Sequence, residues 1–261
     1  MNSKPLGNPS TVIEPRQVDT GRGGSWLAEA FDLFKQEPGT WIGITVVYLL
    51  IMLASTMIPG GSILMSLAGP VFTAGMMLGC DSQSSGQGIK LVHLFEGFKG
   101  GRLGQLVVLA LIYFGACLAL MVVLGVFMLA VFGLSPLHLS TEVIPDQDLL
   151  PLALLALVGL ALYIPIAMGM WLAPALMVLH GVAPLEAFKL SFRGCMVNFM
   201  PFLLYGVIGL LIAVAASIPL FLGWLVAAPV FFISLYTSYR DMFPRPLPPP
   251  AESVPPMHPL V

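Results

Sequence analysis

Residues 104–134 read GQLVVLALIYFGACLALMVVLGVFMLAVFGL, and this stretch decides the class of the fold. It contains no Asp, Glu, Lys, Arg or His. A helix needs about 20 apolar residues to cross the hydrocarbon core of a bilayer, and this stretch exceeds that length. Its apolar residues also lack the alternation that a strand of a membrane β-barrel requires. The stretch therefore predicts a transmembrane helix, which its length requires to be tilted or to end in the membrane interface.

The composition of the whole chain supports this interpretation. Of its 261 residues, 57% are hydrophobic and 9% are charged, and the mean hydropathy is +0.93. Soluble domains carry about 25% charged residues, and a soluble fold of this size cannot bury so much apolar surface. The net charge of −2 gives no sign of nucleic-acid binding. The sequence therefore predicts an all-α membrane protein.

Five further apolar stretches have the length and composition of membrane spans. Helices are expected because every backbone polar group inside a bilayer needs a partner within the protein. Short turns that contain Pro and Gly join the first span to the second and the fifth to the sixth. The six predicted spans, with the quoted stretch as the third, are Gly39–Ile58, Ile63–Cys80, Gly104–Leu134, Leu149–Leu179, Phe199–Ile218 and Leu222–Tyr239.

The positive residues predict how these spans are oriented. All 11 Lys and Arg residues lie before the first span, after the sixth, or in the connections between spans two and three and between spans four and five. The connection between spans three and four carries Glu142, Asp146 and Asp148 instead. Cytoplasmic segments of membrane proteins are enriched in Lys and Arg. The pattern predicts an even number of spans, with both termini in the cytoplasm.

Three segments on the predicted cytoplasmic side are amphipathic at helical spacing: Ser25–Glu37, Leu91–Lys99 and Leu185–Met196. This pattern is typical of helices that lie in the membrane interface. Two interpretations stay open, because the helices either contact anionic lipid or only lead the chain into the next span. The residues expected to share an apolar face are Trp26, Leu27, Ala30, Phe31 and Phe34 in the first segment, Leu91, Leu94, Phe95 and Phe98 in the second, and Leu185, Phe188 and Phe192 in the third. The basic residues that would contact lipid are Lys35, Lys99, Lys189 and Arg193.

The spans form three pairs with shared sequence features, which predict a parallel threefold repeat. Each unit would hold an interfacial helix, an outgoing span, a turn and a returning span, over about residues 25–83, 89–181 and 184–241. Each interfacial helix ends in Phe followed by a base, and each returning span carries a proline after Gly or Ala, at Pro70, Pro174 and Pro229. All units share one orientation, so the repeat axis would lie along the membrane normal.

The prolines allow two interpretations. Proline inside a helix removes a backbone hydrogen bond and kinks the helix, so three equivalent kinks would line a central path. Alternatively, the prolines reflect a packing geometry that was repeated by duplication, since proline is frequent in membrane helices. Gly75 and Gly79 in the second span form a GxxxG pattern, which favours close helix packing.

Side chains that would carry chemistry are scarce. No Asp, Glu, Lys, Arg or His lies deep inside a predicted span, which argues against a proton-coupled pump or an intramembrane protease. The sequence contains no HExxH, GxSxG, GxGxxG or Walker A motif. No metal site or other cofactor is expected, because the cysteines are scattered and the histidines share no helical face. These residues are Cys80, Cys117 and Cys195, and His93, His138, His180 and His258.

Polar and proline-rich residues flank the predicted membrane domain, residues 25–243. Residues 1–24 lack the apolar region of a signal peptide and predict a disordered N-terminal tail. Residues 244–261 include PRPLPPP and predict an extended proline-rich tail, which is either unstructured or a PxxP ligand for a partner.

Short stretches along most of the chain carry a resemblance. They are WIG (41–43), GPVF (69–72), HLF (93–95), APA (173–175), SFR (191–193), PFLLYG (201–206) and SYRD (238–241). From about Glu14 to Phe243, the chain resembles a family of bacterial six-span inner-membrane proteins whose activity is not assigned. It is more distantly similar to the membrane domains attached to some bacterial glycerophosphodiester phosphodiesterases, although the catalytic domain of those enzymes is missing. The resemblance implies an inner-membrane location and a topology, and it implies no activity.

Three functions are compatible with the sequence. The leading hypothesis is a non-enzymatic scaffold, lipid-organising protein or partner subunit, with membrane lipid and other membrane proteins as its partners. The second is a channel or transporter for a small solute, built on the threefold repeat. The third is an enzyme that acts on lipid at the cytoplasmic interface, but no mechanistic motif supports it. Its active groups would be gathered from Asp81, His93, Glu96 and Asp241.

Overall fold

The computed structural model describes residues 13–132 and 146–244, which form helices and connections without a β-strand. The predicted C-terminal tail beyond residue 244, most of the acidic connection and the first 12 residues lie outside this description, as do His138 and His258. In chain order the elements are α1 (Arg22–Gln36), α2 (Pro38–Thr56), α3 (Gly61–Ser84), the 3-10 helix η1 (Leu91–Phe98), α4 (Leu103–Phe132), α5 (Asp146–Trp171), α6 (Ala173–His180), α7 (Pro184–Val197), α8 (Phe199–Ser217) and α9 (Trp224–Met242).

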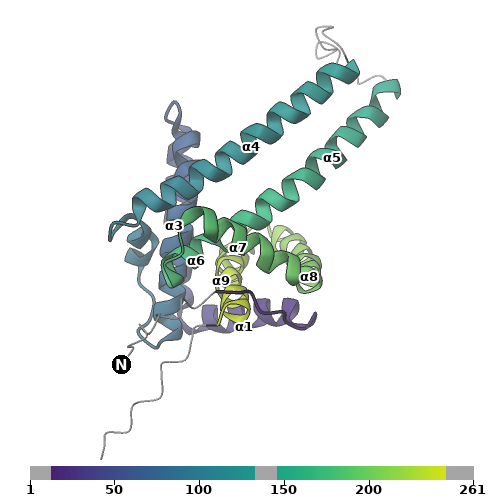
Figure 1. The fold of residues 1–261 in the computed structure, drawn as a ribbon. Helices are drawn as coiled ribbons and strands as arrows, with labels where there is room; N and C mark the ends of the chain where they lie inside the picture. Colours follow the sequence, from purple (N-terminus) through teal and green to yellow (C-terminus); the bar gives the residue numbers. More distant parts are fainter. Residues whose placement is uncertain (1–12, 133–145, 245–261) are drawn as a thin grey trace, which may run out of the picture.

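Helical hairpins form most of the described structure. The pairs are α2 with α3, α4 with α5, and α8 with α9, and a short helix precedes each pair: α1, η1 and α7 (Figure 1). The first hairpin turns at Gly60, whose φ of +77° is readily adopted only by glycine. The third turns through Leu220 and Phe221, which both have positive φ angles and are exposed.

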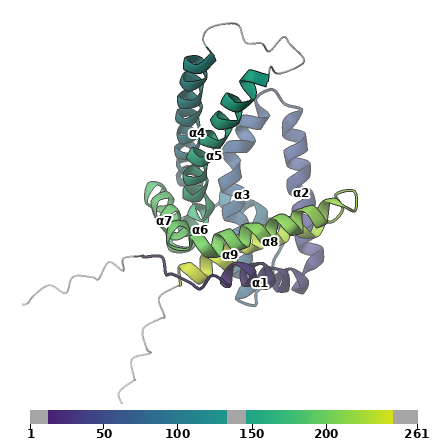
Figure 2. The same cartoon turned by 90° about the vertical axis from the view of Figure 1, so that its right-hand side faces the viewer.

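The hairpins spread apart from a common base instead of forming a parallel bundle. Figure 2 shows α2 and α3 running upward, whereas α8 and α9 run across them near their lower ends. Figure 1 shows α4 and α5 side by side and inclined away from α3. The tips of the hairpins therefore diverge, and their bases meet around α1, α6 and α7.

The hydrophobic core lies at this base, where the short helices contact the ends of the hairpins. Trp26 of α1 and Trp41 of α2 are fully buried, together with side chains from α3, α6 and α9. The Trp41 indole N–H donates to Gln83 Oε1 at 2.9 Å, and Gln83 Nε2 donates to the Leu33 carbonyl at 2.8 Å. These buried polar groups are satisfied inside the core, so they fix the register of the packed helices without an unpaired donor.

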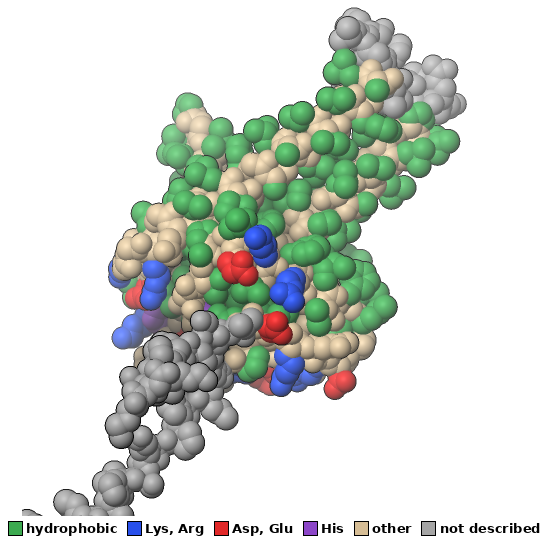
Figure 3. Space-filling model, viewed as in Figure 1, with side chains coloured by type: hydrophobic (Ala, Val, Ile, Leu, Met, Phe, Trp, Pro, Cys, Tyr) green, Lys and Arg blue, Asp and Glu red, His purple; other side chains and the backbone are tan. Residues whose placement is uncertain are grey.

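Charged side chains gather at the same base. Every Lys and Arg whose side chain is described lies on α1, η1 or α7, in a segment beside them, or in the last turn of α9. We call this part of the molecule the charged end. Figure 3 shows Lys, Arg, Asp and Glu in the lower half of the visible face, whereas hydrophobic side chains cover the projecting hairpins. Leu50, Met121 and Leu211 are more than half exposed there, as lipid-facing residues are.

Within the described residues, five helical stretches are long and apolar enough to cross a membrane: Pro38–Thr56, Gly61–Ser84, Leu103–Ala130, Leu149–His180 and Phe199–Ser217. They match the first five predicted spans. The sixth predicted span, Leu222–Tyr239, corresponds to α9 and is not among them. The half of α9 that approaches the charged end carries Ser234, Thr237 and Ser238, which are buried against neighbouring helices. This helix packs inside the protein, and its composition is accordingly less apolar.

The fourth predicted span is broken in the structure. Its first part is α5, which ends at Trp171, and a separate helix, α6, begins at Ala173. Pro174 therefore opens a new helix instead of kinking a continuous one, a position at which proline is tolerated because its missing N–H would be unpaired anyway. The Ser191 hydroxyl of α7 accepts the Leu172 N–H at 2.8 Å and donates to the Met168 carbonyl at 2.6 Å, which bridges the break.

At the N-terminal side, one predicted boundary and one predicted helix face need correction. The chain becomes helical at Arg22, and Arg16 N donates to the Met242 carbonyl at 2.8 Å, so the segment 13–24 is not a disordered tail. Phe31 was expected to share one apolar face with Trp26 and Phe34, but it is 43% exposed, whereas those two and Leu33 are buried.

The apolar faces expected for the other two short helices are also different. In η1 the buried residues are Leu94 and Gly97, which align because a 3-10 helix repeats every three residues, whereas Leu91, Phe95 and Phe98 are exposed. In α7 the buried face consists of Ala187, Leu190, Ser191, Gly194 and Cys195. Leu185 is exposed, and Phe188 and Phe192 are partly buried.

Candidate functional site: a cavity between the hairpins

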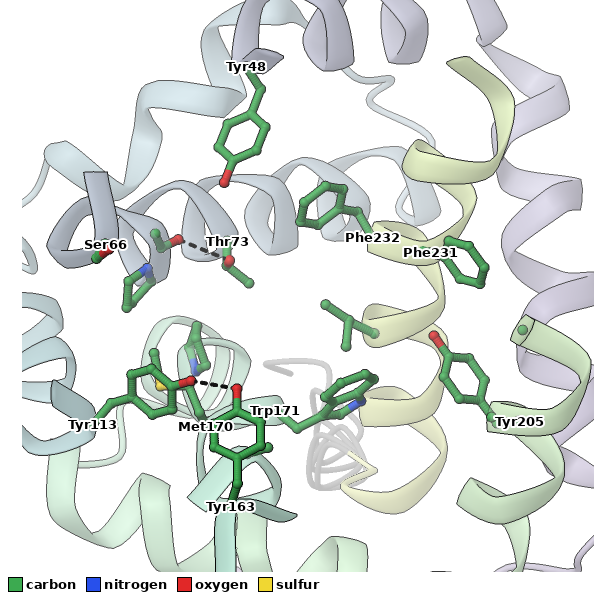
Figure 4. A pocket seen from close by; sticks show the side chains of 17 residues that line it. Tyr48, Ser66, Thr73, Tyr113, Tyr163, Met170, Trp171, Tyr205, Phe231 and Phe232 are labelled. Carbon is green, nitrogen blue, oxygen red and sulfur yellow. Dashed lines mark hydrogen bonds between the residues drawn. The ribbon is translucent and has the colours of Figure 1, made fainter. Parts of the chain in front are cut away.

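A cavity of about 580 Å³ lies where the hairpins diverge. Its wall combines residues from each of the hairpins, so no single hairpin forms it (Figure 4). The residues on the wall are Tyr48 of α2, Ser66, Gly69, Pro70 and Thr73 of α3, Tyr113 of α4, Tyr163, Ala167, Met170 and Trp171 of α5, Pro174 of α6, Tyr205, Gly206 and Gly209 of α8, and Phe231, Phe232 and Leu235 of α9. The volume lies within the range of sites that bind small molecules.

The polar side chains of the wall mostly hydrogen-bond to the protein itself. Tyr113 and Tyr163 join α4 to α5 through hydroxyls 2.9 Å apart, a pair that Figure 4 shows on one side of the cavity. Thr73 donates to the Gly69 carbonyl at 3.0 Å, and Ser66 donates to the Ser62 carbonyl at 2.9 Å. The cavity therefore presents a surface that is more apolar than the number of its hydroxyl groups indicates.

A second polar contact on the wall joins α8 to α9. The hydroxyls of Tyr205 and Ser234 lie 2.8 Å apart, and Ser234 also donates to the Phe231 carbonyl at 2.7 Å. The Tyr48 hydroxyl and the Trp171 indole N–H have no hydrogen-bond partner among the described residues. They are the donors of the wall that remain for a ligand.

Two of the three singled-out prolines reach this cavity. Pro70 lies inside α3 and Pro174 opens α6, and both are on the wall. Pro229 lies inside α9 and is buried, but Phe231 and Phe232 form the wall on that helix. Pro70 and Pro174 therefore lie beside this cavity, and the interpretation that the prolines line a central path stays a prediction.

Packed core closes the cavity toward the charged end. On each of three helices, a residue on the wall is followed toward that end by a fully or almost fully buried residue. These pairs are Tyr48 and Trp41 on α2, Thr73 and Cys80 on α3, and Leu235 and Met242 on α9. Along these three helices, close-packed side chains therefore lie between the cavity wall and the charged end.

The four basic residues singled out by the sequence all lie at the charged end, away from the cavity wall. Lys35 on α1 pairs with Asp32 at 2.8 Å and lies 5.2 Å from the centre of the Phe31 ring. Lys99 directly follows η1, and Lys189 and Arg193 lie on α7. These last three are exposed and form no ion pair with a described residue.

Asp241 organises a second polar group at the charged end. Its carboxylate accepts hydrogen bonds from Arg22 Nε at 2.6 Å, Arg16 at 2.8 Å and the Trp26 indole N–H at 2.9 Å. Partial burial alone would raise the pKa of Asp241, but the hydrogen bonds from Arg22, Trp26 and Arg16 and the charge of Arg22 outweigh burial and lower it. Asn198, between α7 and α8, accepts the Val18 N–H at 2.8 Å. The group ties the chain before α1 to α8 and α9.

Three of the residues suggested for lipid chemistry contact different partners. Asp81 accepts a hydrogen bond from the Tyr236 hydroxyl at 3.0 Å, whereas Asp241 binds Arg16 and Arg22. His93 Nδ1 accepts the Lys90 N–H at 2.9 Å within η1 and its flank. Among the described residues, no group of three or more His, Cys, Asp or Glu is placed to hold a metal ion.

Sequence reasoning singled out the basic residues and the prolines but missed the aromatic wall of the cavity. Tyr113 and Tyr163 lie in the middle of predicted spans, where a tyrosine hydroxyl needs a partner inside the bilayer. That position is the signal that would have identified them. Trp171, at the end of α5, also lies on the cavity wall.

Comparison with known proteins supports a membrane location. Over 211 residues the chain is 28% identical to a protein of Burkholderia thailandensis that is named a probable inner membrane protein, with 77% of each chain covered. No family model and no solved structure matches the chain. The similarity and the apolar helices confirm the predicted resemblance to bacterial inner-membrane proteins, whereas nothing supports the distant resemblance to glycerophosphodiester phosphodiesterases. The chain is an integral membrane protein that is similar to one of the bacterial inner membrane.

Proposed function

We propose that this protein is a non-enzymatic, lipid-organising protein of the inner membrane that contacts anionic headgroups on the cytoplasmic side. One observation carries the proposal: at the charged end, exposed basic side chains share the surface of short helices with exposed apolar side chains. Apolar groups next to bases suit the boundary between acyl chains and anionic headgroups. The short helices α1, η1 and α7 would then lie in the membrane interface.

The surface of α7 is the strongest support for this contact. One face of the helix, including Leu190 and Cys195, is buried against the protein. Outside that face, Lys189 and Arg193 are exposed next to Leu185 and Met196, which are both more than half exposed. The helix therefore has apolar groups left over after packing, together with two bases that have no described acidic partner. Each base near an anionic surface contributes about 1 kcal/mol of attraction.

The same combination occurs beside η1. Leu91, Phe95 and Phe98 are each at least 39% exposed, and Lys99 follows them directly. The ring of Phe98 packs against Phe72 of α3 with centroids 5.1 Å apart, so the helix is held to the first hairpin while part of its apolar surface stays open. The second unit of the proposed repeat would contact lipid through this surface.

The ion pairs of Asp241 agree with an even number of membrane crossings. Both ends of the membrane domain would then lie in the cytoplasm. Arg22 at the start of α1 and Asp241 at the end of α9 are in direct contact, so both lie on the same side of the bilayer. If only the five apolar stretches crossed the membrane, Arg22 and Asp241 would lie on opposite sides. A sixth crossing by α9 would place both residues on the same side. The enrichment of Lys and Arg at this end supports its assignment to the cytoplasmic side.

A parallel threefold repeat accounts for the order of the elements. Each of the three proposed units consists of a short helix followed by a hairpin: α1 with α2 and α3, η1 with α4 and α5, and α7 with α8 and α9. The middle unit differs because its returning helix is broken before Pro174. Repetition would explain why similar short helices stand at three places around the charged end.

The test is lipid retention by the purified protein. Native mass spectrometry would count phosphatidylglycerol and phosphatidylethanolamine bound after detergent extraction from mixed liposomes. We expect Lys189→Glu with Arg193→Glu to remove the preference for phosphatidylglycerol, because two attractive charges become repulsive. The matched control, Lys189→Arg with Arg193→Lys, keeps both charges and should keep the preference. Equal retention of both lipids by the unmodified protein would contradict the proposal.

The cavity favours transport of a small solute as a second candidate function. It lies between all the hairpins and includes Pro70 and Pro174 on its wall. A kink at Pro70 and the helix break before Pro174 would give the hairpins room to move, which would open the packed core below the cavity. Flux of small solutes into proteoliposomes, altered by Pro70→Ala and Pro174→Ala, would support this function. Vesicles without measurable flux of any tested solute would count against it.

A further inference from the structure

We infer that the cavity between the hairpins binds a hydrocarbon chain of a membrane lipid. This inference deepens the proposed lipid-organising function, because it assigns a site for the chain in addition to the surface for the headgroup. It rests on the wall of the cavity, its closed floor and its place between membrane-spanning helices.

The chemistry of the wall excludes a charged ligand and favours a hydrocarbon one. None of the described residues on the wall is Asp, Glu, Lys, Arg or His. The hydroxyls of Tyr113 and Tyr163 satisfy each other, and that of Tyr205 is engaged by Ser234. Only the Tyr48 hydroxyl and the Trp171 indole N–H remain as donors among the described residues of the wall. A charged or strongly polar solute would lose more hydration than these two groups can replace, which is costly in an apolar site. A hydrocarbon chain loses nothing there.

The shape of the cavity indicates that the occupant is lodged and does not pass through. Toward the charged end, packed core follows the wall on α2, α3 and α9, where Trp41, Cys80 and Met242 are fully buried. Its wall consists of helices whose outer surfaces expose large apolar side chains, so the open side of the cavity meets the acyl chains of the bilayer. An apolar cavity in contact with hydrocarbon is filled by hydrocarbon and not by water.

Aromatic rings and glycines give the wall the form of a chain-binding groove. Trp171, Phe231 and Phe232 present flat apolar surfaces from two different hairpins (Figure 4). At Gly69 and Gly206, an added Cβ would meet no atom within 4 Å, so open space lies in front of both glycines. Each methylene buried against such a surface contributes about 0.8 kcal/mol, so a lipid chain can be held by contact with the wall alone.

The experiment uses the full-length protein in bilayer nanodiscs with a phosphatidylethanolamine whose acyl chain carries a photoactivatable diazirine. After illumination, mass spectrometry of the peptides identifies the labelled residues. We expect labelling at Met170, Trp171 and Phe232, which face the cavity. Gly206→Phe would place a ring in the open space and lower this labelling about tenfold, since a few displaced methylenes account for such a change.

Gly115→Phe is the matched control. Gly115 is also an exposed helical glycine in an apolar stretch with no atom within 4 Å of an added Cβ, but it is not on the wall. Gly115→Phe should therefore leave cavity labelling unchanged. Gly69→Phe fills the cavity from α3 and serves as the second blocking variant if Gly206→Phe does not fold. The inference is overturned if folded blocking variants keep the labelling, or if label appears only on outward residues such as Leu210 and Leu211.

The headgroup and chain sites can fail separately. Lys189→Glu with Arg193→Glu should remove the preference for anionic lipid and leave labelling by the zwitterionic probe unchanged. If the unmodified protein prefers anionic lipid but shows no cavity labelling, the chain site alone is refuted. Cavity labelling without any anionic preference in the unmodified protein would refute the proposed headgroup contact alone.

Discussion

At the scale of single residues, one hydroxyl group compensates for a helix break. Ser191 stands where the Leu172 N–H would otherwise donate to the Met168 carbonyl, and it binds both. It is fully buried, and Cys195 Sγ lies 3.7 Å from the same carbonyl. Because buried backbone groups need partners, this side chain makes it possible for α5 to end and α6 to begin inside the protein.

We expect Ser191→Ala to destabilise the protein by about 1–3 kcal/mol, because it leaves the buried Leu172 N–H without its partner and removes one donor from the Met168 carbonyl. Chemical unfolding in detergent micelles would measure the change. Ser66→Ala is the control, since that hydroxyl is exposed and donates only to a carbonyl of its own helix. Equal destabilisation by the two variants would show that the bridge at Leu172 has no special role.

The carboxylate of Asp241 predicts a dependence of stability on pH. Its pKa is lowered in the folded protein because hydrogen bonds and charge from Arg22, Trp26 and Arg16 outweigh its partial burial. Its stabilising effect is therefore complete above the unfolded pKa of about 3.9 and is lost as the pH falls through the lower folded pKa. Wild type should be more stable than Asp241→Asn by a constant amount between about pH 5 and pH 7.

Below about pH 4 this difference should shrink, because protonation of wild type removes the same charge as the substitution. Thermal unfolding of both proteins across this range provides the comparison. A difference that stays constant down to the lowest pH would mean that the carboxylate charge is not what stabilises this contact.

At the scale of elements, glycines determine how closely α3 and η1 pack. A Cβ at Gly75 would lie 2.5 Å from the His93 carbonyl oxygen and 2.8 Å from that of Leu94, and one at Gly97 would overlap the Val71 carbonyl. The GxxxG pattern of α3 therefore works as expected, but its partner is the short helix and not another span. We expect Gly75→Ala to cost about 1–3 kcal/mol through this overlap.

Gly69→Ala is the matched control on the same helix, because a Cβ there meets no atom within 4 Å. Alanine is the better helix former by about 1 kcal/mol, so this variant should be neutral or slightly stabilised. Melting temperatures in detergent would rank the two variants. If Gly75→Ala has the same melting temperature as wild type, then α3 and η1 are not in the contact that the structure describes.

The elements also show which features of a sequence are informative. Apolar length identified the first five spans, because lipid requires it of any helix that faces the bilayer. It fails for α9, where Ser234 and Thr237 are buried by other helices and never face lipid. Helical periodicity located α1, η1 and α7 but misplaced Phe31, because it assumes one buried face and these helices have apolar groups on a second, exposed face. The break at Leu172 depends on Ser191, 19 residues away, which no local pattern contains.

At the scale of the whole molecule, the charged side chains gather at one end and the hairpins diverge from it, which leaves a cavity between the hairpins. The ends of the hairpins near α1, α6 and α7 meet in a packed core at the charged end. The rest of each hairpin therefore extends separately and exposes apolar surface. A cavity at the point of divergence is a result of this arrangement, and it could not be predicted from the sequence because its wall combines residues such as Tyr48, Tyr163 and Phe231 from distant segments.

The direction of each hairpin through the membrane is the most general prediction. With six crossings, the turns of the α2–α3 and α8–α9 hairpins lie outside the cytoplasm. Single cysteines at Ser62 and Ile218, both exposed, should therefore react with a membrane-impermeant maleimide in cells with a permeabilised outer membrane. Gln87→Cys, in the connection between α3 and η1, should react only after the inner membrane is opened.

The native cysteines permit this measurement in a Cys117→Ala background. Cys80 is fully buried, and burial raises the pKa of the Cys195 thiol to about 12, so neither provides much reactive thiolate near neutral pH. The third hairpin decides between alternatives, because the contact between Arg22 and Asp241 allows α8 and α9 either to cross together or not at all. If Ile218→Cys reacts like Gln87→Cys while Ser62→Cys is labelled from outside, this hairpin lies on the cytoplasmic surface and the protein crosses the membrane four times.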